Sequence, residues 1–270
     1  MSIPEEASPI LAAAAYDREL VPWLFAHWAK LLVDLAAPAP SAHIVDLACG
    51  SGLLVRHLVD RFDEDGRVTG VDLDPVMLAY AATTIDDSRV SWHESDAARL
   101  PFASESVDLV CCHQGLQFFP DADAVLAEVR RVLRPKGRVA VAVWGRLEHN
   151  PWPAALSDAV RALLGDAAGD SMSIVCRLGE PDDLAGLLRN ANFDDVAIEV
   201  RERTAKHPNA KEAVAGQLSA LPSGTAIDEL TPERRTELAA KMCGLLDGHI
   251  GPEGRLSVPS TCVFATATKP

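Results

Sequence analysis

The chain has 270 residues, 48% of them hydrophobic and 24% charged, which suits one large globular domain or one domain with an appended cap. Lysine and arginine number 25 and aspartate and glutamate 39, so the formal net charge is −14. That charge opposes binding to phosphate backbones and anionic membrane surfaces, and we expect no nucleic-acid partner.

Targeting signals and cysteine pairs are also missing from the sequence. No run of about 18 uncharged apolar residues exists, so no membrane insertion is expected. The amino terminus carries Glu5 and Glu6 rather than the basic stretch of a secretory signal. The six cysteines are scattered without a C-x-x-C pair, which argues against metal or disulfide roles. We therefore expect a cytoplasmic protein without a bound metal.

Two helices are predicted within residues 9–36, where apolar residues recur at helical spacing on either side of Pro22. We expect residues 1–41 to form an N-terminal helical cap, ahead of a domain spanning 42–270. These helices either pack on a sheet or form one wall of a substrate pocket. Tyr16 is a candidate substrate contact within them.

The stretch 44–54 predicts a buried strand, a glycine-rich turn and the start of a helix. The strand carries Asp46 near its end, and the turn contains Gly50, Ser51 and Gly52. Such a turn lets a ligand approach bare backbone and the positive end of the helix dipole. We interpret it as the pocket of a nucleotide-like cofactor.

Strands and helices alternate along the rest of the chain. Further strands are predicted at 67–71, 89–92, 107–112, 138–143, 196–200 and 257–268, and helices begin near Asp74, Pro120 and Glu180. This alternation predicts an α/β fold with a doubly wound, mostly parallel seven-stranded sheet. The less regular segments near 146–178 and 204–254 are expected to be lid insertions.

Three carboxylates follow three successive predicted strands: Asp46, Asp72 and Asp96. Right-handed crossovers would bring them to one edge of the sheet. An acid after the second strand suits a ribose diol, and one after the third could accept from an adenine amino group. Asp46 could hold the amino end of an amino-acid-like ligand. Each acid taken alone could equally cap a helix or be solvated.

Two cofactors compete for such a pocket. A nicotinamide site favours G-x-G-x-x-G/A, and here the last small position holds Val55. S-adenosylmethionine suits the pattern better, because it has ribose and adenine but no pyrophosphate.

Four motifs then resemble those of class I S-adenosylmethionine-dependent methyltransferases, in the subgroup of quinone-biosynthesis C-methyltransferases and small-molecule methyltransferases. They are DLACGSG at 46–52, VDLDPVML at 71–78, SDAARLPF at 95–102 and VLRPKGR at 132–138. The resemblance covers roughly residues 42–145. It departs from the family pattern at Ala48, where glycine is usual, and a negative φ would accommodate alanine there.

The resemblance implies a Rossmann-like methyltransferase fold and a set of cofactor contacts. Asp46 and the Gly50–Gly52 turn would hold the methionine part, and Asp72 the ribose hydroxyls. Leu73 and Met77 would flank adenine, and Asp96 with Ala97 would contact its edge. The expected cofactor contacts are Asp46, Ala48, Gly50, Ser51, Gly52, Asp72, Leu73, Met77, Asp96, Ala97, His113 and Gln114.

Methyl transfer from a sulfonium mainly requires alignment of the acceptor and exclusion of water, so a general base is optional. His113 is the candidate base, and it could instead only line the pocket or touch the cofactor. Gln117 and His149 are further candidate substrate contacts.

We therefore predict an enzyme that moves a methyl group to the O or C atom of a small, partly apolar metabolite. One alternative is a methyltransferase-fold cyclase or binding protein that holds the cofactor without transferring methyl. A nicotinamide oxidoreductase is a further alternative, disfavoured by Val55. The expected partner is a small-molecule substrate, with a homodimer left open. The acceptor and the atom methylated are not determined by the sequence.

Overall fold

A computed structural model describes residues 9–221, 227 and 229–270. The chain divides into two compact units. The cap unit holds the chain up to Phe25, Leu147–Ile174 and Glu202–Ser260; the sheet unit holds Ala26–Arg146, Val175–Arg201 and Thr261–Pro270. The expected cap of residues 1–41 is thus divided between the units after Phe25. Its residues 1–8, and residues 222–226 and 228 of the expected second lid, lie outside the described residues.

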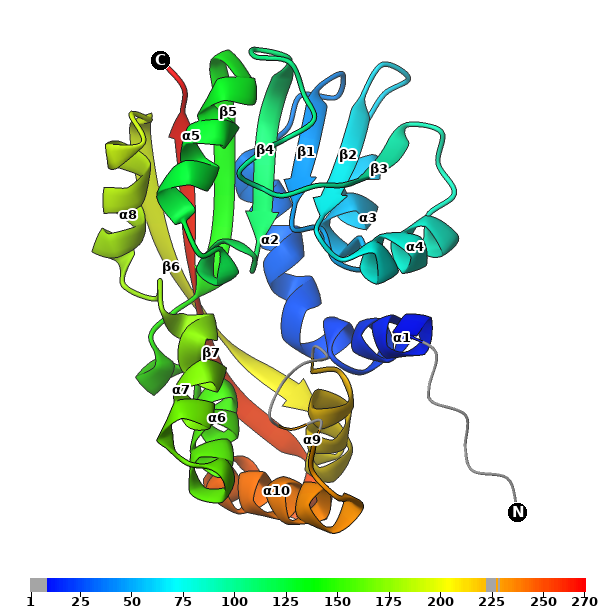
Figure 1. Ribbon diagram of the computed structural model, residues 1–270, viewed down its shortest axis with the longest axis vertical. Helices are drawn as coiled ribbons and strands as arrows, with labels where there is room; N and C mark the ends of the chain where they lie inside the picture. The colour runs from blue at the N-terminus through cyan, green and yellow to red at the C-terminus, as the bar shows by residue number, and fades with distance from the viewer. Residues whose placement is uncertain (1–8, 222–226, 228) are drawn as a thin grey trace. The chain divides into compact units, whose positions relative to one another are not determined.

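The described strands form one seven-stranded sheet in the order β3-β2-β1-β4-β5-β7-β6 (Figure 1). Strands β1 to β5 pair in parallel, and β7 runs antiparallel to β5. This confirms the predicted doubly wound, mostly parallel α/β fold. The strands are β1 His43–Leu47, β2 Arg67–Asp72, β3 Val90–Glu94, β4 Val107–His113, β5 Leu133–Trp144, β6 Asp194–His207 and β7 Leu256–Thr268.

Helices cover both faces of the sheet because side chains alternate along each strand. In β1, Val45 and Leu47 belong to the buried cluster that α5 and α8 complete on one face (Figure 1). Ile44 and Asp46 point to the opposite face, where α2 and α3 contact each other and the sheet. The helices of the sheet unit are α2 Ala26–Ala36, α3 Leu53–Val59, α4 Pro75–Thr84, α5 Ala122–Val132 and α8 Pro181–Asn190. The 3-10 turn η2 Leu116–Phe118 also belongs to this unit, and η4 Ile174–Cys176 crosses the boundary between the units.

Strand β5 begins five residues earlier than the predicted 138–143. Its pairing with β4 is irregular, because Val107 lies opposite Leu133 and Leu109 opposite Arg138. The intervening residues bulge out, with Lys136 in the left-handed region at φ 67°. The amide of Lys136 donates to the carbonyl of Lys269, so the end of the chain stays paired with this bulge.

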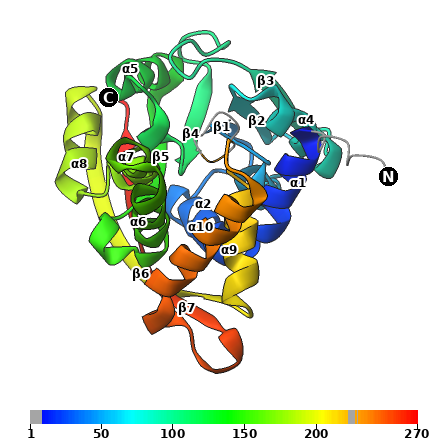
Figure 2. The same cartoon turned by 60° about the horizontal axis from the view of Figure 1, so that its bottom comes forward.

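The cap unit is mainly helical. Pro22 does not break the chain there, because residues Val21–Phe25 form a π-helix (η1) between α1 and α2. In this unit α6 packs against α7 and α10, and α9 packs against α1 and α10 (Figure 2). The cap-unit helices are α1 Pro9–Glu19, α6 Pro151–Leu164, α7 Asp166–Ser173, α9 Ala210–Ser219 and α10 Pro232–Leu245, with 3-10 turns η3 Leu147–His149, η5 Asp247–His249 and η6 Pro252–Gly254. Throughout the described ranges, helices are too short or too polar to cross a bilayer.

Candidate cofactor site at the carboxyl edge of the sheet

The turn between β1 and α3 exposes bare backbone. Gly52 caps the amino terminus of α3 at φ 79°, and a Cβ atom there would lie 2.8 Å from Ile85 and 2.9 Å from Trp92. Gly50 also has positive φ, 51°, yet a Cβ atom on it would meet nothing within 4 Å. The glycine at 52 is therefore required by packing, while Gly50 leaves open space in which a ligand can approach the chain.

Ala48 contradicts the expectation of a negative φ, because its φ is 57°. The turn needs a left-handed residue directly after β1, and alanine adopts that conformation at a cost of roughly 1–2 kcal/mol. A Cβ atom added to Gly115 would lie 2.6 Å from the Cβ of Ala48. The loop after β4 thus approaches this turn closely.

Asp72, the last residue of β2, is held by two backbone amides. Its Oδ2 accepts from the amide of Gly50 at 2.8 Å, and its Oδ1 accepts from the amide of Asp74 at 3.0 Å. The side chain is half-buried. Each carboxylate oxygen keeps a further lone pair. Asp72 is therefore oriented beside the open backbone of Gly50 with capacity to accept two more hydrogen bonds.

Asp46 is 1% exposed, and no cationic side chain of the described residues pairs with it. Neither carboxylate oxygen makes a hydrogen bond of standard geometry to a described residue. Burial and the nearby charge of Asp72 raise the pKa of Asp46 well above its ordinary value, and the amide of Val55 opposes this only in part. A buried acid without a partner is costly, so this position favours a cationic or hydrogen-donating ligand group.

The third acid, Asp96, lies in the loop after β3. Its side chain is 50% exposed, and its Oδ1 accepts from the amide of Ala98 at 2.9 Å. The neighbouring Ala97 is buried. The amide of Ser95 donates to the carbonyl of Asp72 at 3.0 Å, so this loop begins directly beside the end of β2. The parallel pairing of β1, β2 and β3 places all three acids at one edge of the sheet.

Leu73 and Met77 follow Asp72 at the same edge. Leu73 is 71% exposed. Asp74 caps α4 by accepting from the amides of Val76 and Met77, which fixes Met77 in the first helical turn. An apolar side chain is thus presented beside an oriented carboxylate.

His113 and Gln114 end β4. Burial lowers the pKa of His113 to about 3, with a smaller contribution from His57, so the imidazole is uncharged at neutral pH. Gln114 has φ 58°, and its amide nitrogen Nε2 lies 3.5 Å from Sγ of Cys262. Nε2 of Gln117 donates to the backbone oxygen of Gln114 at 3.0 Å and to its Oε1 at 3.2 Å.

Gln117, a predicted substrate contact, makes its hydrogen bonds to Gln114. It is fully buried and directs its Nε2 to two oxygens of Gln114, one from the backbone and one from the side chain. Its Oε1 is buried without a partner among the described residues. In this structure Gln117 supports Gln114.

The remaining predicted substrate contacts, Tyr16 and His149, belong to the cap unit. The ring of Tyr16 stacks on Phe25 with centroids 5.7 Å apart, and His149 is exposed in η3. Their roles stay predictions.

Two side chains that hold the Asp96 loop, Glu128 and Arg131, were not among the predicted site residues. Their i, i+3 spacing on α5 was the available signal. Metal-binding groupings of three or more His, Cys, Asp or Glu side chains are not found in the described parts of the chain.

Comparison with known proteins finds methyltransferases that are similar to this chain. Residues 44–137 match a family described as "Methyltransferase domain". Nocamycin O-methyltransferase of Saccharothrix syringae is 28% identical over 250 residues, covering 88% of this chain and 89% of that protein. The ubiquinone/menaquinone biosynthesis C-methyltransferase UbiE of Bordetella parapertussis is 32% identical over 180 residues, covering 63% of this chain and 70% of that protein.

Solved structures show the same fold at lower identity. Phosphoethanolamine N-methyltransferase 2 of Haemonchus contortus, in complex with phosphomonomethylethanolamine and S-adenosylhomocysteine, superposes with a TM-score of 0.63. It is 19% identical, and the superposition covers 97% of this chain and 57% of that one.

Proposed function

Because this chain belongs to the S-adenosylmethionine-dependent methyltransferase family, we propose that it methylates an O or C atom of a small, partly apolar organic metabolite. The relatives described above include an O-methyltransferase and a C-methyltransferase, which supports both atoms as acceptors. The observation that carries the cofactor assignment is the Asp72 carboxylate, held by the amides of Gly50 and Asp74 beside open backbone.

The residues at this edge fit the chemical groups of S-adenosylmethionine. The buried carboxylate of Asp46, which no described cation neutralises, suits the ammonium group of the methionine part. Asp72 can accept both ribose hydroxyls, and exposed Leu73 offers an apolar surface for the adenine ring. Asp96 can accept from the adenine amino group. The Gly50–Gly52 turn with Ser51 would lie along the methionine part.

S-adenosylmethionine supplies a methyl group on a sulfonium centre, so the protein's contribution is to orient the acceptor and exclude water. His113 and Gln114, at the end of β4, are the sheet-unit residues we place nearest the acceptor. A base with a pKa of about 3 takes up protons weakly, so we assign His113 first to lining the site and second to proton transfer. Tyr16, Gln117 and His149 remain proposed substrate contacts.

Product analysis distinguishes methyl transfer from the alternative, a cyclase or binding protein that keeps its cofactor intact. Mass spectrometry of reactions with candidate phenols, enols and quinols should detect S-adenosylhomocysteine and an acceptor heavier by one CH₂ group in equal amounts. Conversion of an acceptor without S-adenosylhomocysteine would identify the non-transferring alternative.

The cofactor itself is tested by thermal stabilisation. S-adenosylmethionine and S-adenosylhomocysteine should raise the melting temperature, whereas NAD and NADP should not, because ligands that bind only the folded state stabilise it. A cytoplasmic location and a homodimer also stay proposals, and light scattering after size-exclusion chromatography would measure the oligomeric state.

A further inference from the structure

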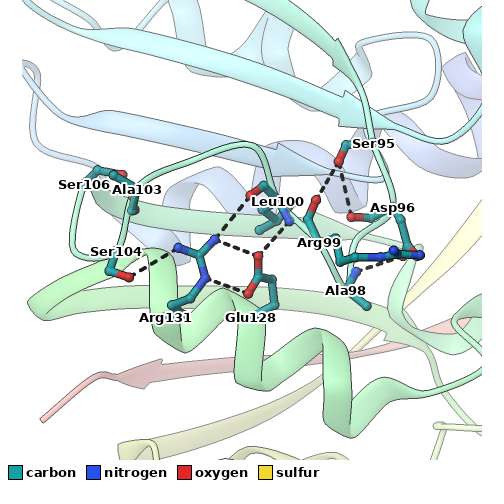
Figure 3. Close-up of polar contacts among 10 residues, drawn as sticks. All are labelled: Ser95, Asp96, Ala98, Arg99, Leu100, Ala103, Ser104, Ser106, Glu128 and Arg131. Atoms are coloured by element: carbon teal, nitrogen blue, oxygen red, sulfur yellow. Dashed lines mark hydrogen bonds and ion pairs between the residues drawn. The ribbon is translucent and has the colours of Figure 1, made fainter.

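The loop that carries Asp96 is attached to helix α5 by an ion pair. Oε1 of Glu128 accepts from the backbone amide of Leu100 at 2.7 Å, and the guanidinium of Arg131 donates to the carbonyl of the same residue at 3.2 Å. Glu128 and Arg131 also bond each other through two contacts of 2.7 Å (Figure 3). One ion pair therefore holds both polar groups of a single backbone residue.

The ion pair is well placed to act as a rigid support. The side chain of Glu128 is 14% exposed and that of Arg131 is 37% exposed. Hydrogen bonds from Arg131 lower the pKa of Glu128 despite its partial burial, and the Leu100 amide adds to this effect. Arg131 further donates to Oγ of Ser104 at 3.3 Å, which extends the attachment along the loop.

Hydrogen bonds tie Arg99, the residue that precedes Leu100, to Ser95 and Asp96. Oγ of Ser95 donates to the carbonyl of Arg99 at 2.8 Å, and the amide of Arg99 donates to the carbonyl of Asp96 at 2.9 Å (Figure 3). The direct ion pair between Arg99 and Asp96 spans 3.8 Å with both side chains exposed, so it orients Asp96 weakly. The loop that carries Asp96 is thus attached at both ends, at Asp72 and at Leu100, while the amide of Ala98 orients its carboxylate locally.

We propose that Glu128 and Arg131 are positioning residues that act through Leu100 to hold Asp96 against the adenine edge and so determine selectivity for an adenine cofactor. This inference rests on the proposed function, in which Asp96 accepts from the adenine amino group. Neither Glu128 nor Arg131 needs to touch the cofactor.

The chain contains a matched control at the other end of the strands. Oδ2 of Asp108 accepts from the backbone amide of His43 at 2.8 Å, and Arg134 pairs with the same carboxylate. Like Glu128 and Arg131, this acid and arginine form an ion pair whose carboxylate holds a backbone amide. The amide lies at the start of β1, away from the carboxyl ends of the strands. Arg134→Met should lower stability without affecting adenine recognition.

The test compares S-adenosylhomocysteine with S-inosylhomocysteine, in which oxygen replaces the adenine amino group, by calorimetry on the full chain. The dissociation constant of S-inosylhomocysteine divided by that of S-adenosylhomocysteine measures recognition of that group. Glu128→Gln and Arg131→Met should lower this ratio about tenfold, equivalent to ~1.4 kcal/mol, by weakening the adenine ligand alone. Arg134→Met should keep the wild-type ratio. Arg131→Lys keeps the charge but loses the planar fork, so it should give an intermediate ratio. This variant provides the test if the others fail to fold.

Asp96→Asn distinguishes the two levels of the proposal. If Asp96→Asn lowers the ratio while Glu128→Gln and Arg131→Met do not, the positioning role is wrong and the assignment of Asp96 stands. If Asp96→Asn leaves the ratio unchanged, the assignment of Asp96 fails and the positioning role fails with it. An equal loss in Arg134→Met would mean that general destabilisation explains the effect.

Discussion

The backbone of Gly115 lies close to the side chain of Ala48: a Cβ atom on Gly115 would be 2.6 Å from the Cβ atom of Ala48. These two residues join the turn after β1 to the loop after β4. Ala48 holds the left-handed conformation at φ 57° that its family usually gives to glycine, and Gly115 leaves the room that the alanine methyl group requires.

This relationship predicts non-additive effects on stability. Gly115→Ala should destabilise the protein by about 1–3 kcal/mol through overpacking. Ala48→Gly should recover part of that loss, although Sγ of Cys112, 2.9 Å from the added atom, remains in place. Urea unfolding of both single variants and the double variant gives the coupling energy. Additive free energies would contradict the contact.

Asp72→Ala should weaken S-adenosylhomocysteine binding by about tenfold to a hundredfold, because two buried hydroxyl groups would lose their acceptor. The amides of Gly50 and Asp74 would lose theirs as well. Calorimetry measures the affinity, and the melting temperature of the free protein reports the structural part of the change. Unchanged affinity would exclude Asp72 from the ribose contact.

Asp46→Asn should separate stability from binding. The raised pKa of Asp46 means that its contribution to stability is fully present below the ordinary value of 3.8 and is lost as pH rises through the raised value. Removing the charge should therefore stabilise the free protein at pH 8, by about 1–3 kcal/mol, and weaken S-adenosylhomocysteine binding. Urea unfolding and calorimetry of the same variant test both directions. Tighter binding by the variant would contradict an ammonium partner.

His113 should give no ionisation near pH 6.5 in the pH profile of kcat/KM, since its pKa is about 3. The folded state disfavours its charged form, so stability should fall as pH drops below 6.5, by at most ~1.4 kcal/mol per pH unit. His113→Gln should reduce this slope in urea unfolding between pH 7 and pH 5. A variant with full kcat would remove His113 from proton transfer.

The sheet was predictable from the sequence because its signal is local. Apolar runs ending near Asp46, Asp72 and His113 alternate with amphipathic helices, and the observed strands end at or beside these residues. The extension of β5 was not predictable, since Pro135 and Gly137 indicate a turn, and pairing with β4 and with the chain end after β7 keeps the segment extended.

The site was predictable where a residue type alone indicates the chemistry, as for acids at strand ends. Backbone conformation was not, because the residue type at Ala48 does not reveal that the turn after β1 requires a left-handed residue there. The support of Leu100 by Glu128 and Arg131 was missed because it joins a loop to a helix 28 residues later.

Asp72 contacts one loop with its side chain and another with its backbone: its carboxylate receives the Gly50 amide, and its carbonyl receives the amide of Ser95. A ligand that immobilises this one residue therefore damps the fluctuations of both loops together. Hydrogen–deuterium exchange should therefore slow in parallel at the amides of Gly50 and Ser95 when S-adenosylhomocysteine is added. Binding of the ribose at Asp72 would then reduce the motion of both loops.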